Sequence, residues 1–202
     1  TRTELQAQAV SSLDPDKKQD SFMMDGTSAQ ILNDGVIVNK EISVPLKRAA
    51  AKIRVSTAYT NGFTASSAGT ISKKLYKYAT NASVVESGGP VIPELQNMAG
   101  FTDISNGMGS DKIIVYSYPN DWSLDQLNET YLIVNIPATG PDGKEHTQNY
   151  YKVPVNFRLP SDDTANPSEE QEAERNALYK LERNRLYDIT ILVDQPGAET
   201  PE

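Results

Sequence analysis

The chain has 202 residues, with 19 Lys and Arg against 27 Asp and Glu, so its formal net charge is −8. This excess of acid argues against nucleic acid and an anionic membrane surface as partners, since both would repel the chain. The absence of cysteine excludes disulfides and thiolate chemistry, and no apolar run reaches the roughly 20 residues that span a bilayer.

The N-terminal stretch predicts a short helix followed by an acidic loop. Residues 3–10 contain good helix formers, with Thr3 as the N-cap. Four aspartates follow: Asp14, Asp16, Asp20 and Asp25. Their spacing approaches a calcium-binding loop, but Lys18 stands at one ligand position and Gln19 stands where such a loop needs glycine. We therefore expect a solvated acidic loop rather than a metal site.

Residues 33–55 read as β structure. Asn33-Asp34-Gly35 is a strong hairpin signal, with residues 36–38 and 42–44 as the expected strands. Residues 51–55 alternate small or apolar side chains with Lys and Arg, which predicts a strand with a basic solvent face. The next 55 residues are polar and weakly periodic, with a strand expected at 75–78. Their glycine runs at 87–90 and 106–109 lack the ending of a phosphate loop, so we interpret them as plain loops.

The second half of the chain carries the clearest strands. Residues 112–118 predict one, and the nearly continuous apolar run 131–136 predicts another that is buried on both faces. The strand expected at 150–157 contains Pro154, which removes a ladder donor and favours a sheet edge or a bulge. Trp122, the single tryptophan, is interpreted as a packing residue, with a sugar-stacking platform as the alternative.

The final strand has the most regular pattern of all. Tyr187, Ile189, Ile191 and Val193 recur at every second position, so they are expected to line the core. Before this strand, residues 161–177 are acidic, and a capping box predicts a short helix over residues 169–176. Helix is therefore expected to be a small minority of the structure.

The sequence offers no candidate catalytic, cofactor-binding or metal-binding residues. His146 is the single histidine, and no glycine pattern of a nucleophile elbow occurs. Paired carboxylates remain an open alternative, because a sequence does not show which distant acids converge. We expect no enzyme and no cofactor.

Three motifs occur in a recognisable order. The first is Phe22-Met23-Met24-Asp25-Gly26, followed by a hairpin and Leu46-Lys47-Arg48-Ala49-Ala50-Ala51-Lys52-Ile53-Arg54-Val55. The second is Tyr116-Ser117-Tyr118-Pro119-Asn120, and the third is Arg183-Asn184 followed by Tyr187 and the alternating strand. Together, over residues 22–193, they resemble the fimbrillins, the major and minor fimbrial subunits of Bacteroidales type V pili.

The resemblance implies a mainly β protein with an antiparallel β-sandwich of transthyretin-like or Greek-key type. Residues 1–55 would be the remainder of an incomplete N-terminal β domain, and residues 56–202 the C-terminal sandwich. It also implies a structural or adhesive subunit of a cell-surface fimbria, exported and anchored at the outer membrane as a lipoprotein precursor. Other fimbrial subunits would be the partners, with host or bacterial surface receptors as further partners.

Assembly in this family implies strand complementation. An N-terminal strand is removed by proteolysis, and a C-terminal strand from the next subunit fills the exposed edge or groove. We therefore expect residues 1–55 to present a long unpaired edge or an apolar groove.

The chain departs from the family pattern at both ends. Few strands precede residue 22 and no further apolar strand follows residue 193, so a fragment and a tip or anchor subunit are both open interpretations. The alternative function is a carbohydrate-binding β-sandwich at the same cell surface. An exposed Trp122 among tyrosines would favour that alternative, and a buried Trp122 would count against it.

Overall fold

The computed structural model describes residues 9–11, 13–17, 22–27, 32–33, 36–37, 43–85, 91–104, 112–157, 168 and 178–201. Within these ranges the regular secondary structure is β-strand, apart from a single 3₁₀ turn, η1 (Gln126–Asn128). The mainly β fold class predicted from the sequence is confirmed.

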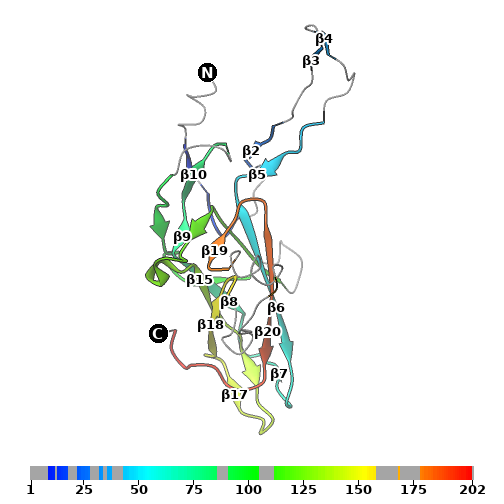
Figure 1. Ribbon diagram of the computed structural model, residues 1–202. Helices are drawn as coiled ribbons and strands as arrows, with labels where there is room; N and C mark the ends of the chain where they lie inside the picture. Colours follow the sequence, from blue (N-terminus) through cyan, green and yellow to red (C-terminus); the bar gives the residue numbers. More distant parts are fainter. Residues whose placement is uncertain are drawn as a thin grey trace.

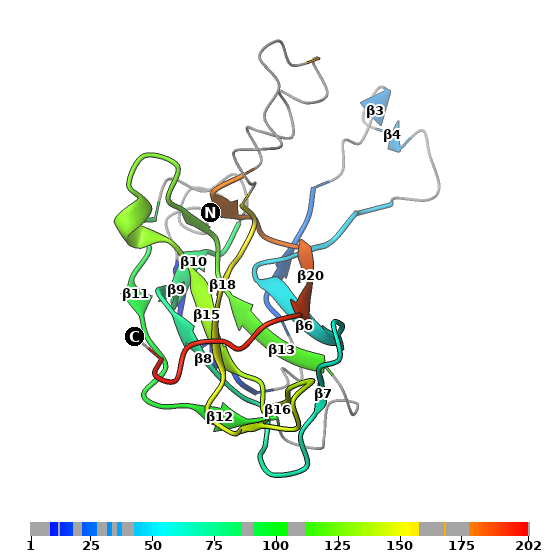
Figure 2. The ribbon, with the colours of Figure 1, turned by 90° about the horizontal axis from the view of Figure 1, so that it is seen from below.

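Two main sheets form the body of the molecule (Figures 1 and 2). The three-stranded sheet has the order β13 (Lys112–Ser117), β6 (Ala51–Tyr59), β20 (Leu186–Val193). The four-stranded sheet has the order β12 (Thr102–Asp103), β8 (Ser72–Tyr76), β15 (Tyr131–Asn135), β18 (Tyr150–Pro154). All pairings in the four-stranded sheet are antiparallel, whereas β20 runs parallel to β6, a pairing that the expected antiparallel sandwich did not include.

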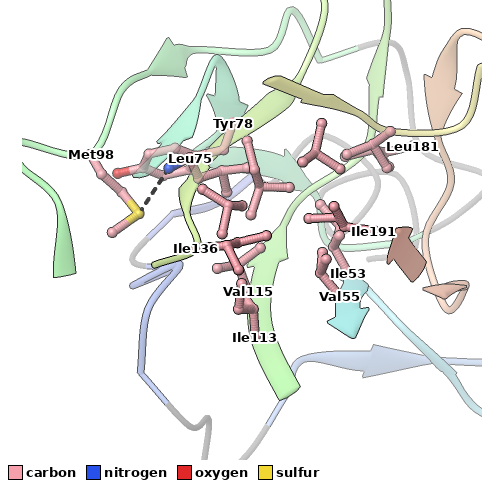
Figure 3. Packing of buried hydrophobic residues seen from close by; sticks show 14 of the residues in the cluster. Ile53, Val55, Leu75, Tyr78, Met98, Ile113, Val115, Ile136, Leu181 and Ile191 are labelled. Carbon is pink, nitrogen blue, oxygen red and sulfur yellow. Dashed lines mark hydrogen bonds between the residues drawn. The ribbon is translucent and has the colours of Figure 1, made fainter. Parts of the chain in front are cut away.

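The core lies between these sheets because each strand alternates its side chains. Ile53, Val55 and Val115 reach it from the three-stranded sheet, and Leu75 reaches it from β8 (Figure 3). On β15, four of the five residues are buried, as the continuous apolar run predicted. Burying one such aliphatic side chain contributes about 1.5–3 kcal/mol.

A second buried cluster covers one flank of the sandwich. It contains Leu13, Ala49, Ala50, Ala79, Ala82, Tyr116 and Tyr118. The N-terminal segment reaches it through β1 (Ala9–Ser11), which pairs with β10 (Asn81–Ser83). Close by, β9 (Tyr78–Ala79) pairs with β11 (Leu95–Gln96). Residues 3–10 were expected to be helical, and this is wrong for Ala9 and Val10, because pairing with β10 overrides helix propensity.

An arm extends from one end of the body (Figure 1). At its base β2 (Met24–Asp25) pairs with β5 (Lys47–Arg48), and at its tip β3 (Leu32–Asn33) pairs with β4 (Val36–Ile37). The predicted Asn33 hairpin is confirmed. The second strand predicted for this hairpin, residues 42–44, was wrong, because Ser43 and Val44 are not in a strand. Leu32 and Asn33 pair with β4 instead. Gly26 allows the close approach, since a Cβ there would lie 2.2 Å from the Pro45 carbonyl oxygen.

Short ladders complete the described structure. The order β17 (Glu145–His146), β16 (Ala138–Thr139), β7 (Thr64–Ala65) forms a small sheet, and β14 (Asn120–Asp121) pairs with β19 (Lys180–Leu181). The expected helix over 169–176 and both glycine-run loops lie outside the described residues.

The predicted domain boundary after residue 55 falls inside β6. Residues 52–55 pair with both β13 and β20, and Ala51, Ile53 and Val55 belong to the core of the sandwich. The division into an N-terminal remainder and a C-terminal domain otherwise stays a prediction.

Candidate functional site

Residues of the first and third motifs meet at the base of the arm. Arg183 lies with its Nη2 2.6 Å from Oδ1 of Asp25, and both side chains are largely buried. The same guanidinium donates to the carbonyl oxygens of Arg48 and Val84 at 3.4 and 3.5 Å. Two motifs some 160 residues apart in the chain are thus joined by a charge-assisted contact.

Asn184 adds a second link between the motifs. Its Oδ1 accepts a hydrogen bond from the backbone N–H of Arg48 at 3.2 Å, and its own N–H donates to the Ala50 carbonyl at 3.0 Å. The φ of Asn184 is 60°, a left-handed conformation that asparagine tolerates better than most residues. These contacts orient the chain where it enters β20.

Tyr187 and Asn120 are anchored through their polar ends. The Tyr187 hydroxyl accepts a hydrogen bond from the Glu182 N–H at 2.9 Å, and burial raises the pKa of Tyr187. Asn120 is buried and donates to the Thr130 hydroxyl and the Asn128 carbonyl, both at 2.9 Å. The motif residues are therefore satisfied structural contacts, and they stabilise the frame that holds β20.

The strand β20 is a sheet edge eight residues long. Lys52 donates its N–H to the Arg185 carbonyl, and Thr60 donates to the Val193 carbonyl. Because the backbone groups of alternate residues point to opposite sides of a strand, the odd-numbered residues of β20 face β6. The N–H and C=O groups of Asp188, Thr190 and Leu192 point the other way, where no described strand pairs with them.

The other edges of the two sheets differ from β20. On β13, Tyr116 donates its N–H to the Pro15 carbonyl, and Tyr118, just beyond it, donates to Ala79. β18 lies at an edge, as Pro154 predicted, and Tyr150 at its start pairs with Ala198. Natural sheets protect edges with prolines, charges or covering segments. Among the described strands, β20 is the long edge that has neither a proline nor a covering segment.

The inner face of β20 is incompletely buried. Ile191 and Val193 are buried, as predicted, whereas Tyr187 and Ile189 pack against the core but are only partly buried. On the outer face, the Asp188 carboxylate pairs with Arg54 of β6, and this contact lowers the pKa of Asp188. Tyr187 and Ile189 therefore lie at the margin of the hydrophobic core.

Trp122 and His146, which the sequence analysis considered for sugar stacking and for catalysis, lie away from these motif contacts. Trp122 is buried, with 1% of its surface exposed, as the packing interpretation predicted. His146 lies in β17, 6.4 Å from the Phe63 ring between centroids. Its neighbour Glu145 accepts hydrogen bonds from the Ser66 and Thr139 hydroxyls, with Ser66 the main cause of its lowered pKa.

The aspartates of the N-terminal loop face cations rather than one another. Asp14 pairs with Lys17, and Asp16 Oδ1 lies 2.6 Å from Nζ of the buried Lys73. The expectation of a fully solvated loop was therefore wrong for Asp16, whose partner reaches it from β8. Asp20 lies outside the described residues, and no group of three or more His, Cys, Asp or Glu that could hold a metal occurs within the described ones.

Comparison with known proteins places two solved structures beside this chain. One is the tip fimbrial protein Mfa3 of Porphyromonas gingivalis with a C-terminal truncation, at 15% identity and a TM-score of 0.41, covering 80% of this chain and 52% of that one. The other is described as a cell adhesion protein of Parabacteroides distasonis, at 18% identity and a TM-score of 0.45, covering 85% of this chain and 60% of that one. The chain thus spans little more than half the length of either neighbour.

Two other comparisons returned nothing. No protein-family profile matches the sequence, and no curated protein matches it. Among the described residues, no helix is long and apolar enough to cross a membrane. The role proposed below therefore rests on the chain's own motifs and on the edge of β20.

Proposed function

We propose that this protein is a structural or adhesive subunit of a bacterial cell-surface fimbria, joined to a neighbouring subunit by addition of a β-strand to β20. The observation that carries the proposal is the open edge of β20, with its outward N–H and C=O groups at Asp188, Thr190 and Leu192. An extended segment of a neighbour would pair with these groups, as in strand-addition complexes.

The inner face of β20 supports the same proposal. A strand added to β20 would place alternate side chains beside Tyr187 and Ile189, which pack against the core but are only partly buried. Each 100 Å² of apolar surface removed from water there would contribute about 2.5 kcal/mol. Backbone pairing would supply affinity, and the fit beside Ile189 would supply selectivity for the added segment.

The proposal extends to location and partners. The protein would work at the cell surface, exported as a lipoprotein precursor and assembled with other fimbrial subunits, and the resemblance of the three motifs to fimbrillins supports this. An exposed Trp122 among tyrosines would favour the carbohydrate-binding alternative, and Trp122 is buried, which counts against it. A sugar platform at that residue is therefore not proposed.

The test is incorporation into surface filaments. Thr190→Pro removes an outward N–H without removing an N–H that bonds to β6, and Thr190→Val keeps the backbone donor. In producing cells, we expect wild type and Thr190→Val in sheared surface filaments, detected with an antibody to this chain, and about tenfold less of Thr190→Pro. Equal incorporation of all three would refute strand addition at β20, and a chain never found in filaments would refute the fimbrial role.

A further inference from the structure

A cavity lies where the arm meets the outer face of the three-stranded sheet. Its volume is about 340 Å³, within the range of small-molecule sites. The lining comes from the arm base, the start of β6, the end of β13 and the turn before β20. The lining residues are Phe22, Arg48, Ala50, Ala51, Lys52, Tyr116, Asn184, Arg185 and Leu186.

Strand register explains why these side chains converge. Lys52 of β6 lies opposite Tyr116 of β13 on one side and Leu186 of β20 on the other, so the three form one row across the sheet. Since Ala51 points into the core, this row faces outward. Phe22 packs on Tyr116 with ring centroids 5.2 Å apart, which gives the cavity an aromatic wall.

The polar part of the lining is cationic. Arg48, Lys52 and Arg185 contribute three positive charges, in a chain whose net charge is −8. Arg185 pairs with Glu182, but within the described part of the chain no carboxylate forms an ion pair with Arg48 or Lys52. Arg54, one row further along the sheet, differs in this respect because Asp188 pairs with it.

We infer that this cavity binds a carboxylate-bearing sugar residue. The carboxylate would lie between Arg48 and Lys52, where charge-assisted hydrogen bonds are about twice as strong as neutral ones. The apolar face of the ring would pack on the partly exposed Phe22, which lies on the buried Tyr116. The enclosure by four segments fits a compact ring rather than an extended chain. The site includes Leu186 at the start of β20, but it does not depend on strand addition along Asp188, Thr190 and Leu192.

Calorimetric titration of the purified chain tests the assignment with three probes: D-glucuronate, D-glucose and acetate. We expect glucuronate to bind at least tenfold more tightly than glucose or acetate, and more weakly as salt is raised. Arg48→Gln and Lys52→Gln should each weaken glucuronate binding about tenfold. Arg54→Gln is the matched control, with the same loss of charge on the same sheet face, and should leave binding unchanged.

Each other outcome contradicts the assignment. Glucose binding as tightly as glucuronate would remove the role of the carboxylate, and acetate binding as tightly would reduce the cavity to a site for a bare anion. Absence of glucuronate binding by a folded wild-type chain would overturn it outright. Thermal unfolding of Arg48→Gln and Lys52→Gln checks that they fold, and their incorporation into filaments should match wild type, which separates this failure from failure of the fimbrial role.

Discussion

At the scale of single residues, Lys73 is the side chain whose environment is most demanding. It lies on β8 with 4% of its surface exposed, on the same face as the core residue Leu75. Its Nζ is 2.6 Å from Asp16 and donates to the Thr102 hydroxyl at 3.2 Å. A buried ammonium loses its hydration, so it is tolerated only because these partners replace the lost water.

We expect Asp16→Ala to lower the free energy of unfolding by about 2–4 kcal/mol, since it leaves a buried charge uncompensated. Urea denaturation gives the value. The control is Asp14→Ala, which breaks an exposed pair with Lys17 and should cost less than about 1 kcal/mol. Equal losses in the two variants would show that the pair with Lys73 carries no special stability.

The Asp188–Arg54 pair predicts a defined pH dependence. The Arg54 guanidinium, which donates to both carboxylate oxygens, lowers the pKa of Asp188 below its ordinary 3.8. A lowered folded-state pKa means that the stabilisation is complete above the unfolded pKa and is lost as pH falls through the folded one. Carboxyl-carbon NMR titration should find the pKa of Asp188 below 3.8 in wild type and closer to 3.8 in Arg54→Gln. Identical titration curves would contradict the pairing.

At the scale of elements, the alternation along β20 separates core from surface within two adjacent residues. Ile191 has 9% of its surface exposed and Leu192 has 54%. Ile191→Ala should therefore lower the free energy of unfolding by about 2–4 kcal/mol, and Leu192→Ala by less than about 1 kcal/mol. Both values come from one denaturant series. A loss at Leu192 as large as at Ile191 would mean that the outer face of β20 is covered by another part of the chain.

The strands that the sequence predicted well are those whose burial follows a local pattern. β13, β15, β18 and β20 lie where the apolar periods placed them, because each pattern records which face meets the core. The contacts that escaped prediction are non-local. Nothing local shows that β20 pairs in parallel with β6, or that Asp25 meets Arg183. The position of Lys73 also escaped prediction, because the expected strand began at Leu75, whereas β8 begins at Ser72.

The candidate site also combines features that the local sequence predicts with features that depend on non-local contacts. The length and period of β20 follow from its sequence, but its position at an edge depends on the order of strands in the finished sheet. The cationic cavity at the arm base likewise needs the register that puts Lys52 between Tyr116 and Leu186. The alternating pattern predicted that Lys52 lies on the solvent face, but it does not show that Tyr116 and Leu186 lie beside it.

At the scale of the whole molecule, the arm and the sandwich are held together by the motif junction. Arg183 contacts Asp25, Arg48 and Val84, which belong to both arm strands and to the body. The junction also forms one wall of the cavity and leads directly into β20 through Asn184. A single contact set therefore determines where the arm leaves the body and how the edge strand begins.

Arg183→Lys tests this arrangement. Lysine keeps the charge but cannot reach Asp25 and two carbonyls at once with a planar fork, so the arm base should open more often. Hydrogen–deuterium exchange should show faster uptake at residues 22–27 and 47–50, with β15 unchanged. Arg185→Lys is the matched control, because its exposed pair with Glu182 spans one turn only. Uptake at the arm base that matches wild type in Arg183→Lys would show that the short β2–β5 ladder holds the arm without the Arg183 contacts.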